Sequence, residues 1–175
     1  MFFAADLLLV LFPFLYLRVF DKIKGVRESL RALGLFFRSP AEDIKATILL
    51  FLAFILLSML LSAVFSVLGV NDLWKMDSVI SSVKNQHIYI AAYLILVGAF
   101  SEEVFFRGFL VNKMGIWAPA VLFALVHVPY GSLAEVLGAF ALGALGGAAY
   151  RANKNIIPNI FAHIGYNLMA IGGLV

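Results

Sequence analysis

The sequence predicts an all-α membrane protein, a polytopic bundle of about six transmembrane helices with one amphipathic helix at the interface. Of the 175 residues, 63% are hydrophobic and only 13% are charged, whereas a soluble domain is about half apolar and about a quarter charged. A soluble fold of this size could not cover so much apolar surface, so its solvent must be largely lipid. We therefore expect a multi-pass integral protein of the cell membrane.

The apolar residues are grouped in six stretches. Crossing about 30 Å of hydrocarbon takes about 20 helical residues, a length that every stretch except the fourth reaches or approaches. The first stretch lacks the basic start and the small-residue cleavage site of a signal peptide, so we expect a retained helix. The stretches are Phe2–Val19, Thr47–Val70, Ile88–Leu110, Ile116–Val128, Leu133–Tyr150 and Ile156–Val175.

Capping signals mark the start of two helices. Ser39 and Glu42 form a capping box around Pro40, so the second helix should begin before the membrane. Ser132 and Glu135 form another at the fifth helix, and we interpret Glu135 as a cap rather than a catalytic acid. Between the first two stretches, residues 26–37 alternate basic and apolar side chains, a pattern typical of a helix in the headgroup plane.

We expect one domain, residues 1–175, with a catalytic core at 88–175 and N-terminal membrane and interfacial helices at 1–70. Charge predicts its orientation, because cytoplasmic loops are rich in Lys and Arg. If the loop 20–45 is cytoplasmic, the outer loops hold only Lys75 and Lys84. The cytoplasmic loops then hold nine basic residues: Lys22, Lys24, Arg27, Arg31, Arg38, Lys45, Lys113, Arg151 and Lys154.

Composition also limits the partners and the chemistry. The net charge of +3 is explained by contact with anionic lipid headgroups, so membrane lipids are expected partners and nucleic acid is not. The chain has no cysteine, which excludes disulfides, thiol catalysis and thiolate metal sites.

Ionisable residues inside an apolar helix are costly and therefore informative. Glu103 and Arg107 are spaced i, i+4 in the order that favours an ion pair. Glu102 lies about 100° around the helix, away from that partner, and is free to act as a base. The alternative is that both glutamates belong to one structural network around Arg107.

Two further apolar helices carry polar side chains. His127 alone is typical of a buried core histidine. His163 and Asn167 share one helical face and can both donate to a developing oxyanion, or they can form a polar clasp between helices. We call the side of the bundle with the nine basic loop residues the basic end. Counted from this end, Glu102, His127 and His163 lie at similar depths of about 10–16 Å. We therefore expect one water-filled cavity that opens towards that end.

Together these motifs resemble those of the CPBP family (CAAX protease and bacteriocin-processing, also called ABI) of intramembrane proteases, which includes the CAAX prenyl endopeptidases. The resemblance covers residues 88–175. It rests on Glu102-Glu103-x-x-x-Arg107, Phe123-x-x-x-His127 and His163-x-x-x-Asn167.

The resemblance implies an endopeptidase that cuts near the membrane surface, with C-terminal processing of CAAX-like, lipidated or small peptides as the expected type of reaction. It implies that Glu102 and His127 activate a water, that His163 and Asn167 stabilise the oxyanion, and that Glu103 and Arg107 support the site.

Metal dependence and two other functions stay open at this point. A metalloprotease label attaches to the family, and Glu102, His127 and His163 would make a two-histidine, one-glutamate zinc set. No H-E-x-x-H is present, and we favour a metal-free site without a cofactor. One alternative is a non-catalytic scaffold or bacteriocin-immunity-type protein that binds a peptide or partner. Another is an ion-coupled transporter, for which the expected repeat symmetry is missing.

Overall fold

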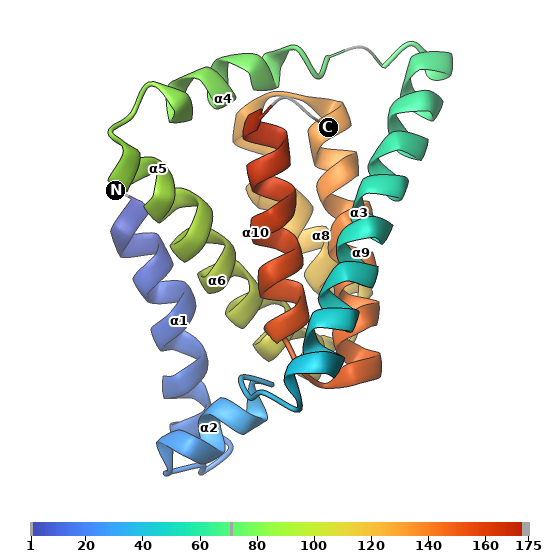
Figure 1. Ribbon diagram of the computed structural model, residues 1–175. Coiled ribbons are helices and arrows are strands. Elements are labelled where there is room, and N and C mark those ends of the chain that lie inside the picture. Colours follow the sequence, from blue (N-terminus) through green and yellow to red (C-terminus); the bar gives the residue numbers. More distant parts are fainter. Residues whose placement is uncertain (1, 71, 173–175) are drawn as a thin grey trace.

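The computed structural model describes residues 2–70 and 72–172, and within these ranges the chain is helical, with no strand. The predicted all-α class is therefore confirmed. Figure 1 shows an upright bundle, with α2 at one end and α4 lying across the other. The separate helices are α1 (Phe2–Val19), α2 (Val26–Ala32), α3 (Pro40–Leu68), α4 (Lys75–Lys84), α8 (Trp117–Val126), η3 (Val128–Tyr130), α9 (Leu133–Asn153) and α10 (Ile157–Gly172).

The chain from Ile88 to Met114 is one continuous helix of mixed type. Its π-helical parts form i to i+5 hydrogen bonds and are wider than α-helical turns. The sequence predicts a uniform helix over Ile88–Leu110, and the side-chain pattern gives no sign of the π turns. The successive segments are α5 (Ile88–Tyr93), the π-helical η1 (Leu94–Gly98), α6 (Ala99–Glu102), the π-helical η2 (Glu103–Val111) and α7 (Asn112–Met114).

Three described helices are long and apolar enough to cross a membrane: Pro40–Leu68, Ile88–Met114 and Leu133–Asn153. The segment Trp117–Tyr130 is a shorter apolar helix, as the short fourth stretch predicts. On α3, large side chains such as Leu56 (66% exposed) and Val67 (88% exposed) are mostly uncovered by protein, which suits a lipid-facing surface. The number of spans, about six, stays a prediction.

The helix boundaries bear out both caps and change two other assignments. The Oγ atoms of Ser39 and Ser132 accept hydrogen bonds from the amides of Glu42 and Glu135, at 3.2 and 3.1 Å. Helix α2, which the sequence predicts to lie at the interface, ends earlier than the pattern over 26–37 predicts. The segment after α3, interpreted as a loop, contains α4. The last stretch is described as helix only to residue 172, and its final three residues lie outside the described range.

The N-terminal helices form part of the same core as the motif-bearing helices. α1 packs against η2 and α6, while α3 packs against α10 and α9. Leu17 and Leu33 are buried in one cluster with Val104 and Ile156. The motif helices at 88–172 are therefore held in place by the helices at 2–68.

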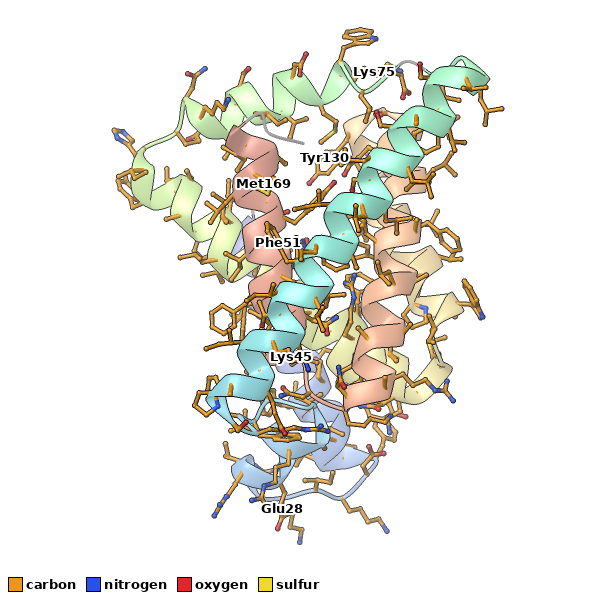
Figure 2. The ribbon with its side chains drawn as sticks, turned by 45° about the vertical axis from the view of Figure 1, so that its right-hand side comes forward. Glu28, Lys45, Phe51, Lys75, Tyr130 and Met169 are labelled. Atoms are coloured by element: carbon orange, nitrogen blue, oxygen red, sulfur yellow. The ribbon has the colours of Figure 1, made fainter. Side chains whose placement is uncertain are left out.

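Asp72 ties the segment before α4 to the start of α9. Its carboxylate accepts hydrogen bonds from the Ser132 hydroxyl at 3.0 Å and from the amides of Leu133 and Ala134 at 2.6 and 3.1 Å. These backbone donors stabilise the charged form and lower the pKa of Asp72 to about 2. Lys75 adds a bond to the Gly131 carbonyl at 2.9 Å, and Figure 2 shows Lys75 beside Tyr130 at this end of the bundle.

The two ends of the bundle provide a test of orientation. Lys75 lies in α4 and Arg31 lies in α2, at opposite ends (Figure 1). If the basic end is cytoplasmic, a cysteine at position 75 should react with an impermeant maleimide in intact cells, and a cysteine at position 31 only after permeabilisation. The natural chain contains no cysteine, so there is no background labelling. The reverse pattern would invert the topology.

Gly108 allows the helix to approach the chain just after α2. A Cβ atom at Gly108 would lie 2.7 Å from the Leu33 carbonyl oxygen, a backbone atom that cannot swing away. Gly108→Ala should therefore destabilise the protein by about 1–3 kcal/mol, measured as a lower melting temperature in detergent. Gly98→Ala in the same helix is the control, because a Cβ there meets nothing within 4 Å. Equal effects of the two substitutions would contradict this explanation.

Candidate active site

A buried ion pair supports the site. Oε1 of Glu103 lies 3.3 Å from Nη1 of Arg107, and the two side chains are only 1% and 3% exposed. This is the pair that the i, i+4 spacing predicts. Oε1 of Glu103 also lies 2.9 Å from Nδ1 of His163 on α10. Since a carboxylate accepts, Nδ1 carries the hydrogen and donates it. Glu103 thus fixes the orientation of the His163 ring.

Gly146 on α9 leaves space for the side chain of Arg107. The Arg107 guanidinium lies over the Phe123 ring, 4.3 Å from its centroid. A Cβ at Gly146 would come within 3.3 Å of Nε of Arg107 and 3.1 Å of Nδ2 of Asn159. Asn159 donates to the Gly146 carbonyl at 2.8 Å. Gly146 therefore allows two polar side chains to reach the α9 backbone.

Glu102 contacts the other side of the same imidazole. Its Oε2 is 3.8 Å from Nε2 of His163, and its side chain is 29% exposed, far more than that of Glu103. The two neighbouring glutamates thus face opposite nitrogens of one ring, Glu103 in close contact and Glu102 at a distance longer than a hydrogen bond. The sequence predicts no partner for Glu102, and the structure places His163 beside it. A water can bridge a polar gap of this length.

His127 is held in a single tautomer. Its Nδ1 lies 2.7 Å from the Phe123 carbonyl oxygen. A carbonyl can only accept, so Nδ1 donates, and in the neutral ring Nε2 keeps its lone pair. His127 is the C-terminal cap residue of α8, and its ring packs edge-on against that of Tyr130, with 5.5 Å between the centroids. The ring therefore has a free nitrogen that can accept a proton.

A cavity of about 80 Å³ brings most of the predicted site together. Its lining includes Glu103, Arg107, His127, His163 and Asn167. Glu102 is not among the lining residues and joins the group through its approach to His163. A water in a protein cavity occupies at least about 10–15 Å³ on this measure of volume. The cavity therefore has room for a few waters but not for a peptide.

Part of the cavity wall comes from the α4 end of the bundle. Glu135 and Gly138, which also line it, come from the first turns of α9, and His127 directly follows α8. Both of these helix ends lie at the end that α4 crosses (Figure 1). Phe54, midway along α3, and Arg107, near the Met114 end of its helix, also line the cavity. The direction in which it opens therefore stays a prediction.

Three residues near the site have no part in the chemistry that the sequence predicts. Asp6 of α1 accepts hydrogen bonds from the hydroxyls of Ser101 and Tyr93 at 2.8 and 3.0 Å. Ser101 directly precedes Glu102 in the sequence. An acid inside the first apolar stretch is the signal that could have identified it. Tyr166 and Glu135 line the cavity. Glu135 is in a capping box, as predicted, but its side chain also belongs to the cavity wall.

The residues do not fit a metal centre. Among residues 2–70 and 72–172, no three His, Asp or Glu side chains are grouped so that they could hold a metal ion. The geometry therefore does not support the alternative zinc set of Glu102, His127 and His163, and it gives no basis for a metalloendopeptidase mechanism.

Comparison with known proteins adds one match. A family model described as "Type II CAAX prenyl endopeptidase Rce1-like" matches residues 84–169. This range contains all three motifs and nearly coincides with the resemblance found from the residues. Neither the curated proteins nor the solved structures gave a match to the chain.

Proposed function

Because the chain belongs to the Rce1-like family of type II CAAX prenyl endopeptidases, we propose that it is a membrane-embedded endopeptidase that cuts near the C-terminus of CAAX-like or other small peptides. The observation that carries the proposal is His163, which contacts both glutamates of the first motif. A purely structural pair would need only Glu103 and Arg107. The additional, partly exposed carboxylate of Glu102 beside a histidine supports chemistry at this point.

In the proposed mechanism, a water attacks the peptide carbonyl carbon. Glu102 takes one proton of this water through its carboxylate as the oxygen attacks, and the free Nε2 of His127 accepts a hydrogen bond from the other. The proton is then delivered to the amine that leaves. Both groups work without a metal, because each already provides a proton acceptor.

His163 and Asn167 stabilise the oxyanion in this proposal. The Nδ1 hydrogen of His163 is engaged by Glu103, so the ring can donate to substrate only from a protonated Nε2. Arg107 balances the charge of Glu103. The Asn167 amide, in the same cavity wall, supplies the second donor.

The test is a cleavage assay on the purified full chain in lipid nanodiscs. Peptides that end in a CAAX-like sequence are supplied with and without a prenyl group, and fragments are identified by mass spectrometry. We expect a cut near the C-terminus with the parent protein. A preference for the prenylated peptide would identify the lipidated substrate class, and equal cutting would indicate small peptides in general. Tight binding of the peptides with no cut in any of them would favour the non-catalytic scaffold.

A further inference from the structure

A second and larger cavity lies at the basic end of the bundle. Its volume is about 270 Å³. The walls come from four places: the end of α1 with the loop after it, α2, the end of the helix 88–114, and the end of α9. The cavity at His127 and His163 is lined by a separate set of residues. The function proposed above assigns no role to this second cavity.

The second cavity carries an excess of positive charge. Arg31, Lys113 and Lys154 line it, together with one acid, Asp21, so the wall has a formal charge of +2. Asp21 is paired with Lys113, whose Nζ lies 2.6 Å from its carboxylate. Lys154 donates to the Asn112 amide oxygen at 3.0 Å, a neutral partner. Within the described part of the chain, Arg31 has no ion pair. Two of the three cations are therefore left without an anion.

Most of the remaining wall is apolar. Leu17, Leu33 and Phe109 line the cavity and are 4%, 1% and 4% exposed. The cations are at least partly exposed, with Arg31, Lys113 and Lys154 all accessible to solvent. The cavity thus combines cationic side chains that reach solvent with a buried hydrocarbon surface. A ligand for this cavity must therefore carry an anionic group.

We propose that this cavity binds the phosphate group of an anionic phospholipid. Arg and Lys are the side chains that recognise phosphate oxygens, Arg as a planar fork and Lys as a point charge. Basic pockets between membrane helices are suited to lipid headgroups. A free phosphate offers the same oxygens, but the cavity lies at one end of the bundle (Figure 1), where a membrane protein meets the phosphates of the headgroup layer, so the lipid is favoured. This inference does not depend on the peptidase assignment.

The test compares two double variants of equal charge. Arg31→Gln with Lys154→Gln removes the two unpaired cations from the cavity. Arg27→Gln with Arg151→Gln removes two exposed cations, one from α2 and one from α9. Neither Arg27 nor Arg151 lines the cavity. Short-chain phosphatidylglycerol is titrated into each purified protein in neutral detergent, with phosphatidylcholine and inorganic phosphate as parallel arms. The melting temperature is the readout.

For the parent protein, phosphatidylglycerol at about 100 times its Kd should raise the melting temperature by on the order of 5–10 °C. Each cation near a lipid headgroup contributes a factor of about 5 in affinity. The cavity double variant should therefore bind about 30-fold more weakly, while the control double variant should match the parent.

Equal losses in the two double variants would show non-specific attraction and overturn the proposal. Equal stabilisation by phosphatidylcholine would remove the requirement for an anionic lipid and overturn it as well. If inorganic phosphate stabilised the parent as strongly as phosphatidylglycerol at the same concentration, the ligand would be a soluble phosphate and the lipid assignment would be wrong. If the cavity variant failed to fold, the single substitution Arg31→Gln, on an exposed residue of α2, would serve instead, with about 5-fold weaker binding expected.

Discussion

Glu102→Gln should lower the turnover of peptide cleavage by about 10²–10⁴-fold, the usual cost of losing a general base. Glutamine keeps the size and polarity of the side chain but cannot take a proton from water. The side chain is 29% exposed and lies 3.8 Å from His163, so its loss should leave the core unchanged. The expected result is an inactive protein that melts within a few degrees of the parent, measured with the peptide assay and by thermal unfolding.

Glu42→Gln is the matched control for this variant. Glu42 is an exposed acid in the first turn of α3, away from both histidines, and its substitution should leave cleavage unchanged. Full activity of Glu102→Gln would remove Glu102 from the mechanism. Equal loss in both variants would indicate a general effect of removing negative charge.

Arg107→Ala should destabilise the protein by about 3–5 kcal/mol, the cost of breaking a buried ion pair on one side. Glu103 would be left 1% exposed without its guanidinium partner, and the contact of Arg107 with the Phe123 ring would also be lost. The measurement is the melting temperature in detergent, together with the amount of folded protein recovered. Lys113→Ala is the control, because it breaks an exposed pair whose side chains are 32% and 30% exposed. Its cost should stay below about 1 kcal/mol.

A double variant separates the lost charge from the lost packing. Glu103→Gln with Arg107→Gln removes both charges and keeps similar volumes, so it should be more stable than Arg107→Ala alone. A double variant no more stable than Arg107→Ala would mean that packing, not the stranded carboxylate, dominates. An unchanged melting temperature in Arg107→Ala would contradict the buried-pair interpretation altogether.

Features that depend on neighbours along the chain could be predicted from the sequence. The bounds of α1 follow from its apolar run, and the starts of α3 and α9 follow from their serine caps. The pairing of Glu103 with Arg107 follows from their spacing. Each depends on contacts within about one helical turn, where residue type largely decides geometry.

Features that depend on contacts between distant segments could not be predicted. Asp6 meets Ser101 across 95 positions, and no local pattern reveals that partner. The contact of Glu102 with His163 depends on how α10 packs against the helix 88–114, and residue spacing predicts only which face each occupies. The segment Lys75–Lys84 becomes a helix although few of its residues are apolar, and α10 and η3 pack against it.

The π-helical segments affect how this protein should respond to the deletion of a residue. A π turn holds more residues than the α turn that it replaces, so η2, from Glu103 to Val111, contains surplus chain. Deletion of one residue there would let the wide turn relax to α geometry, with little rotation of the helix beyond it relative to Glu102. The same deletion in a regular α-helix, such as α3 or α9, would rotate everything beyond it by about 100°. A single-codon deletion in η2 should therefore disturb the facing of the helix less than one in α3 or α9.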